Sequence, residues 1–278
     1  IVSGGGTLLL GGTNVTAGTL QVGNGSTTGT LGVGNLTVNN ATLAFNFSAG
    51  SYTVGNATSN AYITLNNTTV NVASGNVTLA GTTTTAGTSV SARKVAVDLL
   101  GTNNFTANSG ASFNLFGNST AAWTNSIVVE DGAVLNANGA ITLTANGSSG
   151  TGGHWALGLF GNSTMNALSG STLQVNVNQA VADWGITQYG TNATLSTTGN
   201  ATFNVSSLNV GWGGQSSSGN TAPRLNAANG TVTINLAGSP SNGGFYMNGA
   251  GVMNATATGN IIINGSSSAN IALVAASS

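Results

Sequence analysis

The chain has 278 residues, of which three are basic and four acidic, and its formal net charge at pH 7 is −1. Three cations exclude nucleic acid as a partner, because such a partner presents many phosphates that each need neutralising. More than half of the residues are Gly (43), Thr (40), Asn (39) or Ser (30), which favour strands and turns over helices. Because 40% of the residues are hydrophobic, the chain can still bury a core.

Strand-like segments of alternating apolar and polar residues begin early, at residues 6–11, 18–23, 29–34 and 41–46. Their starts lie about 11–12 residues apart, a spacing typical of short strands joined by turns. The same pattern continues to the C-terminal part with Gly, Asn and Ser between strands and no helical segment. It predicts an all-β protein, which leaves a sandwich, a barrel or a solenoid. No linker-like stretch interrupts the pattern, so we expect one domain over residues 1–278.

An exact repeat favours the solenoid. The hexapeptide LFGNST occurs at residues 115–120 and again at 159–164, a shift of 44 residues. We interpret this shift as two coils, which predicts a right-handed parallel β-solenoid (β-helix) of about 20–22 residues per coil. With strands about 4.8 Å apart, the chain would form roughly 13 coils and a rod on the order of 60 Å.

Two segments resemble a known group of repeat proteins. The run GGGTLLLGGTNVTAGTLQVGNGSTTGTLG (4–32) resembles the autotransporter-associated β-strand repeat. The run DGAVLNANGAITLTANGSSGTGG (131–153) resembles coils in the passenger regions of autotransporters and two-partner-secreted exoproteins. The resemblance implies a β-solenoid at an extracellular or cell-surface location.

Catalytic and metal-binding constellations are not found in the sequence. The acidic residues are Asp98, Glu130, Asp131 and Asp183, of which two are adjacent, and His154 is the single histidine. Without clustered carboxylates, Cys or a second His, we expect no enzyme activity, no metal and no cofactor. We expect Asp131 to lie in a turn.

The remaining charges form one group in the sequence SARKVAVDLL. Arg93, Lys94 and Asp98 belong to it, and we expect an ion pair across a bend or with a neighbouring coil. Longer apolar runs such as IALVAA are far shorter than the roughly 20 residues of a spanning helix, so no membrane-spanning segment is expected.

Four tryptophans recur at similar intervals. Trp123, Trp155, Trp184 and Trp212 follow one another at separations of about 30 residues. They could stack in the core, or they could form an aromatic contact stripe for a sugar on one face.

Asn residues raise the question of glycosylation, because the motif N-x-S/T occurs 19 times. The reversed motif S/T-x-N is nearly as frequent, since residues i and i+2 share one strand face, so strand geometry explains most of the excess. Candidate N-glycosylation sites are Asn14, Asn35, Asn56, Asn118, Asn162, Asn200 and Asn264.

Three functions fit these observations. The first is an extracellular structural protein that assembles with itself into a cell-surface filament, sheath or coat. The second is an adhesin rod or passenger domain that binds a host or neighbouring cell surface, with glycans as candidate partners. The third is an ice-binding solenoid, for which the sequence TTTT at 82–85 interrupts the required T-x-T ranks.

The self-assembly hypothesis depends on the two ends of the printed sequence. Neither shows a charged or helical cap, and such caps normally prevent strand edges from pairing. We expect copies to join through strands that contain Ile1, Val2, Leu8 and Leu10 at one end and Ile261, Ile263, Ile271 and Leu273 at the other. With so few charges, stability should be nearly independent of pH and salt.

Overall fold

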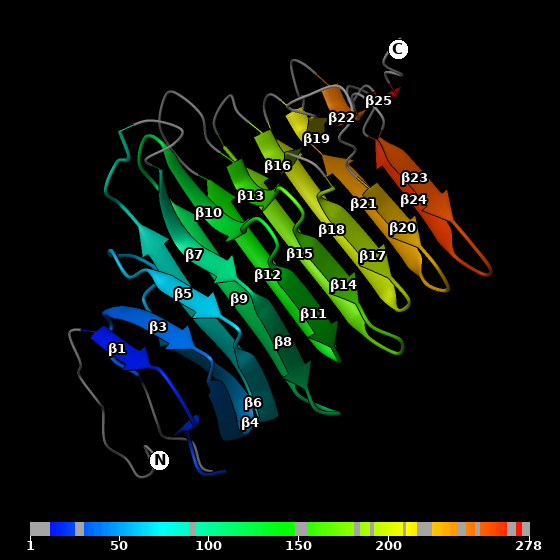
Figure 1. The fold of residues 1–278 in the computed structure, drawn as a ribbon. Helices are drawn as coiled ribbons and strands as arrows, with labels where there is room; N and C mark the ends of the chain where they lie inside the picture. The colour runs from blue at the N-terminus through cyan, green and yellow to red at the C-terminus, as the bar shows by residue number, and fades with distance from the viewer. Residues whose placement is uncertain are drawn as a thin grey trace.

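The computed structural model describes residues 12–25, 31–88, 93–147, 155–180, 184–189, 192–207, 210–215, 224–237, 243–247, 251–265 and 271–273. Within these ranges the protein is all-β and contains no helix. Parallel strands stack on one another from coil to coil, so that β1 and β25 lie at opposite ends of the molecule (Figure 1). The predicted β-solenoid is confirmed.

One sheet has ten strands, each paired with the corresponding strand of the next coil. Its strands are β1 (Gly12–Val15), β3 (Asn35–Asn39), β5 (Ile63–Asn66), β7 (Lys94–Leu100), β10 (Thr124–Val129), β13 (Trp155–Phe160), β16 (Trp184–Tyr189), β19 (Val210–Gln215), β22 (Gly243–Met247) and β25 (Ile271–Leu273).

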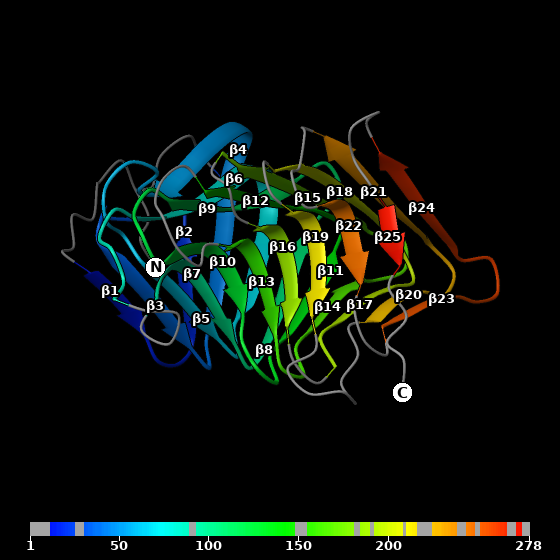
Figure 2. The ribbon, with the colours of Figure 1, turned by 90° about the horizontal axis from the view of Figure 1, so that it is seen from above.

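The second sheet has fifteen strands and consists of two ladders, which the long strands β4 (Thr42–Gly55) and β6 (Thr69–Thr83) join. The first ladder contains β2 (Thr19–Val22), the beginnings of β4 and β6, β8 (Thr102–Ala107), β11 (Val134–Asn138), β14 (Thr164–Ala167), β17 (Thr194–Thr197), β20 (Arg224–Ala227) and β23 (Val252–Ala255). The second ladder contains the ends of β4 and β6, β9 (Ser112–Ser119), β12 (Ala140–Gly147), β15 (Thr172–Gln179), β18 (Asn200–Ser207), β21 (Thr231–Ala237) and β24 (Asn260–Gly265). Figure 2 shows the ten-stranded sheet and these two ladders around a shared interior.

The coils are longer than the sequence analysis expects. Leu36 pairs with Ile63, and Ile127 pairs with Leu157. Many coils therefore take about 27–30 residues, and the separation of register partners ranges from 23 residues between Gly12 and Asn35 to 36 between Asn76 and Ser112. Three strands per coil require this length, since each coil contributes one strand to the ten-stranded sheet and one to each ladder. The estimate of 13 coils is too high, because each described coil contributes one strand to the ten-stranded sheet, which therefore spans ten coils at most.

The LFGNST repeat does not mark equivalent positions. Leu115–Ser119 lies in β9 of the second ladder, whereas Leu159 and Phe160 end β13 of the ten-stranded sheet. Gly117 is extended within a strand, but Gly161 has φ +56° in the turn after β13. The shift between the two copies is about one and a half coils, so the identical hexapeptide adopts two conformations.

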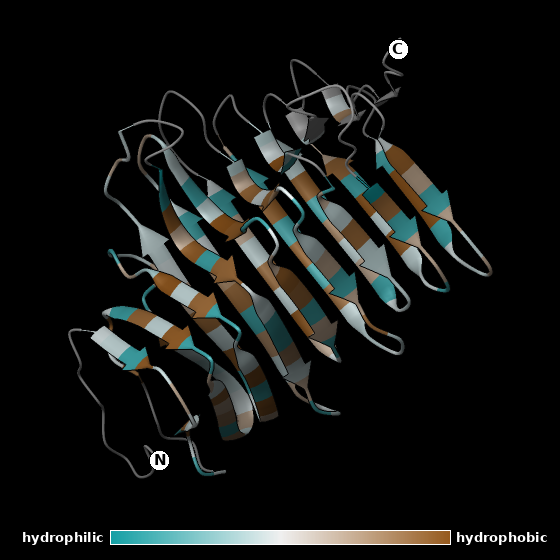
Figure 3. Ribbon diagram, viewed as in Figure 1, coloured by the Kyte–Doolittle hydropathy of each residue, from teal (hydrophilic) through white to brown (hydrophobic). Residues whose placement is uncertain are grey.

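The core follows from the alternation of apolar and polar residues along each strand, as Figure 3 shows. One inward row of the second ladder illustrates the packing: its residues stack one above another and are all buried, namely Leu79, Leu115, Leu143, Val175, Phe203 and Ile234. Rows of this kind from both sheets merge into one hydrophobic cluster. Outward positions carry the Thr and Asn residues.

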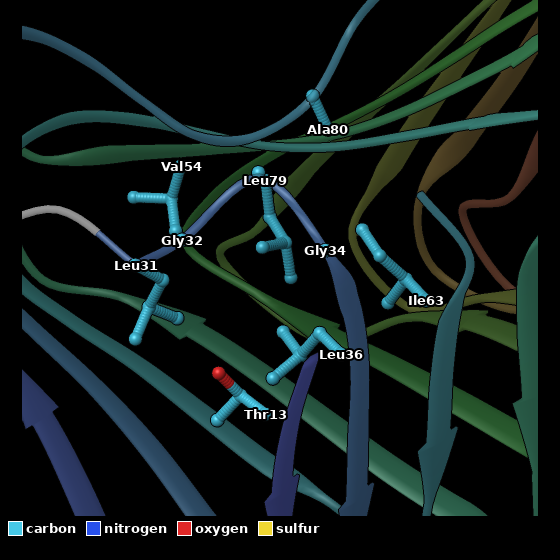
Figure 4. Close-up of a pocket in the computed structure, with 10 residues that line it drawn as sticks. Thr13, Leu31, Gly32, Gly34, Leu36, Val54, Ile63, Leu79 and Ala80 are labelled. Atoms are coloured by element: carbon cyan, nitrogen blue, oxygen red, sulfur yellow. The ribbon is translucent and has the colours of Figure 1, made fainter. Parts of the chain in front are cut away.

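Packing is less complete near the first coils. A small cavity of about 10 Å³ lies among Leu31, Leu36, Val54, Ile63 and Leu79 (Figure 4). A space of this size is at the lower limit for one water molecule, and the apolar lining offers little for a water to bind. The cavity is a packing defect of the core and not a ligand site.

Candidate functional site

Three of the seven charged residues meet on the outer face of the ten-stranded sheet. Arg93 immediately precedes β7, Asp98 lies within β7, and Glu130 follows β10 of the next coil. Asp98 pairs in register with Val128, and the Glu130 N–H donates a hydrogen bond to the Leu99 carbonyl at 3.0 Å. The register therefore places charges from two coils beside one another.

Strand alternation directs the Asp98 side chain away from the core. Its neighbours Val97 and Leu99 are both fully buried in the core cluster. Asp98 is thus on the opposite face, in the row that continues through Val128 to Gly158.

Arg93 connects the Glu130 carboxylate to an aromatic ring. Its Nη2 lies 2.8 Å from Glu130 Oε1, and its Cζ lies 4.5 Å from the centre of the Phe160 ring. This is an ion pair combined with a cation–π contact. Phe160 in turn lies 5.2 Å from Trp155 and 6.4 Å from Tyr189, measured between ring centres.

Gly158 allows the Phe160 ring to lie close to the sheet. A Cβ atom at residue 158 would be 2.3 Å from Phe160 Cε2, which is far below a van der Waals contact. The same relation recurs two coils on, because a Cβ at Gly213 would be 2.2 Å from Cζ3 of Trp184. Glycines on this face therefore give aromatic side chains space to cover the strands.

The environment of Asp98 raises the pKa of its carboxyl group from 3.8 to about 7. Loss of solvent on burial is the main cause, the charge of Glu130 adds to it, the Arg93 guanidinium opposes it, and a hydrogen bond with the Glu130 side chain raises it further. Asp98 Oδ1 and Arg93 Nε are both buried without a hydrogen-bond partner among the described residues. The cluster can therefore hold a proton close to neutral pH.

The predicted charge pairing is found between coils. Arg93 pairs with Glu130 of the next coil, while Lys94 is exposed. Asp131 lies in a turn, as predicted, and its Oδ1 accepts a hydrogen bond from the Asn162 N–H at 2.7 Å. The sequence analysis missed the meeting of Asp98 with Glu130, which the true coil length would have indicated. His154 and Asp183 lie outside the described residues.

The four tryptophans do not share one face. Trp155 and Trp184 are register partners on β13 and β16 and are half-buried. Trp212 is 1% exposed, and its Nε1 donates a hydrogen bond to Gln188 Oε1 at 3.0 Å. Trp123 has φ +56° in the turn before β10. Any aromatic contact surface is therefore limited to Trp155, Trp184 and the rings near them.

Asn side chains form hydrogen-bonded ladders that the sequence analysis did not foresee. In the long Asn ladder, on the second ladder of strands, Asn264 donates to Asn235, Asn235 to Asn204 and Asn204 to Asn176, at 2.9, 2.9 and 3.0 Å. In the short Asn ladder, on the first ladder of strands, Asn166 donates to Asn136 and Asn136 to Asn104, both at 2.8 Å. Such amide ladders stabilise stacked parallel strands.

The candidate glycosylation sites differ in what their side chains already bind. The Nδ2 groups of Asn118, Asn162 and Asn264 donate hydrogen bonds to Ala57 O, Asp131 Oδ1 and Asn235 Oδ1. Asn35, Asn56 and Asn200 instead accept backbone hydrogen bonds at Oδ1, and Asn14 is exposed on β1. A glycan attaches at Nδ2, so Asn14, Asn35, Asn56 and Asn200 are the sites where attachment would break none of these bonds.

The expected assembly strands are partly described. Ile261 and Ile263 lie on β24, where they pack against the core and stay half-buried, and β24 pairs with β21. Ile271 and Leu273 belong to β25, which pairs with β22. Ile1, Val2, Leu8 and Leu10 lie outside the described residues.

Neither a metal-binding cluster nor a membrane-spanning helix is found in the described part of the chain. No three His, Cys, Asp or Glu side chains there come close enough to hold an ion, and no helix there is long and apolar enough to cross a membrane. Comparison with protein-family models, with curated proteins and with solved structures finds no match.

Proposed function

We propose that the chain is a structural β-solenoid of an extracellular surface, which assembles with itself end to end into a filament, sheath or coat. The backbone pairing of strands from coil to coil carries this proposal. Among the described strands, β23 and β24 end the fifteen-stranded sheet and β25 ends the ten-stranded one, each with a partner on one side only. A strand of another copy can add to such a sheet edge by the same parallel pairing that joins successive coils.

Charge and composition support the same proposal. A net charge of −1 gives little repulsion between copies, and the outward Thr and Asn residues give a neutral, hydrogen-bonding surface. The resemblance of residues 4–32 and 131–153 to autotransporter and exoprotein passengers supports an extracellular location.

The experiment places a charge on the open edge. Ile262 points outward from β24 and is 45% exposed, and its row continues through Thr233 to Thr202 in the interior of the sheet. Ile262→Lys should prevent end-to-end polymers in sedimentation and electron microscopy, while Thr202→Lys adds the same charge in the same row and should leave them intact. A wild-type chain that stays monomeric at all concentrations would disprove the proposal.

An adhesin rod is the second candidate, and the aromatic cluster beside Arg93 favours it. Tyr189 is 38% exposed and lies near Phe160. Tyr189→Ser should then reduce binding of the rod to cells without changing its thermal unfolding.

Ice binding has less support, because the Thr residues do not form ranks. Thr142 and Thr144 align with Gln174 and Asn176 in the next coil, so amides interrupt both columns.

A further inference from the structure

A groove crosses the outer surface of the second ladder. It encloses about 300 Å³. Asn176, Asn204 and Asn235 of the long Asn ladder form one wall. Because these residues occupy the same position on successive strands, the groove runs along the axis of the solenoid.

The other wall is the next outward row, two residues further along each strand. It contains Asn178 and Ser206, which are register partners, and Asn146, which precedes Asn178 in the same row. Val177 and Val205 lie between the two walls along the strands, but their side chains point into the core, with 3% and 1% of their surface exposed. The groove thus has walls of amide and hydroxyl groups and a floor formed by the strand backbone.

The wall amides have hydrogen-bonding capacity that the ladder does not use. A carboxamide offers two N–H donors and two acceptor lone pairs. Asn204 donates once, to Asn176, and accepts once, from Asn235, while Asn235 donates once to Asn204 and accepts once from Asn264. Each therefore keeps one donor and one lone pair, repeated at the strand spacing of about 4.8 Å.

The chemistry of the walls selects the type of ligand. None of the described residues that line the groove is charged, so it offers no cation to neutralise a phosphate, sulfate or carboxylate. A paired donor and acceptor matches a hydroxyl group of a sugar, which can both accept and donate.

We propose that this groove binds a neutral linear polysaccharide along the solenoid axis. Each free amide then forms hydrogen bonds with one or two hydroxyl groups of a sugar. The site goes beyond the structural role and does not require self-assembly. A second copy of the chain, docked by its own Asn ladder, is the competing occupant.

The test measures binding of defined oligosaccharides to the full chain by isothermal titration calorimetry. Cellohexaose and N-acetylchitohexaose are the neutral probes, and hexagalacturonate is the anionic comparison. We expect a neutral probe to bind and the anionic one to bind at least tenfold more weakly.

Variants then locate the site. Asn204→Ala with Asn235→Ala removes two of the three amides of this wall and should weaken binding at least tenfold. Asn136→Ala is the matched control, because it interrupts the short Asn ladder, which lies outside the groove. Asn178→Trp fills the groove from its second wall without touching the long Asn ladder, so it should abolish binding in a chain whose circular dichroism is unchanged.

Two results would overturn the proposal. One is the absence of binding to either neutral probe at millimolar concentration. The other is an Asn178→Trp chain that loses lateral self-association but still binds the glycan. That result would identify a second copy of the chain as the occupant of the groove. Ile262→Lys separates the two proposals, since it should block end-to-end assembly and leave glycan binding unchanged.

Discussion

Single glycines at the turns decide whether neighbouring coils can stack closely. Gly139 has φ +85°, and a Cβ there would lie 2.1 Å from the Ala107 carbonyl oxygen. Gly170 has a similar φ of +75°, but nothing lies within 4 Å of its Cβ position. Replacing Gly170 by Ala therefore measures the cost of the backbone conformation alone. Replacing Gly139 by Ala measures the same cost together with the cost of a clash.

We predict that Gly139→Ala destabilises the fold by about 3 kcal/mol or more, because the backbone conformation and the clash both oppose it. Gly170→Ala should cost only about 1–2 kcal/mol, the penalty of the left-handed conformation. Urea unfolding of both variants measures the difference, and equal losses would contradict the close approach of Gly139 to Ala107.

Asp98 makes stability depend on pH, which corrects the expectation of a nearly flat profile. The raised pKa means that the unfolded chain ionises this carboxyl from about pH 4, while the folded chain keeps its proton until about pH 7. Its contribution to stability is therefore complete below pH 4, falls as the pH rises to 7 and stays low above.

We predict that Asp98→Asn stabilises the protein at pH 8 by on the order of 4 kcal/mol, since the pKa of Asp98 rises from 3.8 to about 7 and each pKa unit corresponds to about 1.4 kcal/mol. At pH 4 the gain should vanish. Urea unfolding at both pH values measures it. Asp131→Asn, in a turn, is the control. It should leave the difference in the free energy of unfolding between pH 4 and pH 8 as in the wild type.

At the scale of the element, inward rows contribute most of the stability of each strand. Leu143 is fully buried in the middle of its row, between Leu115 and Val175. Its neighbour Thr142 is half-buried on the outer face.

We predict that Leu143→Ala lowers the free energy of unfolding by about 2–5 kcal/mol, because it removes buried methyl groups and leaves a cavity. Thr142→Ala on the same strand should change it by less than about 1 kcal/mol. If the two losses were similar, the assignment of the inner face of β12 would be wrong.

The short Asn ladder should contribute less to the free energy of unfolding than an inward row does. Asn136 lies in its centre, donating to Asn104 and accepting from Asn166. We predict that Asn136→Ala costs about 1–2 kcal/mol for these two hydrogen bonds. Asn71 is exposed on β6 and makes no side-chain hydrogen bond among the described residues, so Asn71→Ala should cost less than about 0.5 kcal/mol in the same thermal unfolding experiment.

For the whole molecule, parallel backbone ladders and one continuous core replace surface charge. The Arg93–Glu130 contact is the one ion pair among the described residues. We predict that the urea midpoint at fixed pH hardly changes between about 0.05 and 1 M NaCl, since salt acts on exposed charges mainly by screening them. A large loss of stability at high salt would contradict this account.

The sequence by itself determined the strand class, the inward and outward faces and the neutral surface. These properties depend on alternation and composition, which are local: Leu143 and Thr142 face opposite sides wherever the strand lies. The turn at Asp131–Gly132 is local in the same way.

Only the tertiary structure decided the coil length and the residues that meet between coils. Coil length depends on how many strands close one turn around the core, so the same hexapeptide is a strand at Leu115 and a turn at Gly161. Asp98 meets Glu130, and Asn204 meets Asn235, through a coil-to-coil register that no short repeat in the sequence reveals. Stacking imposes this register because every backbone N–H and C=O must find its partner in the adjacent coil.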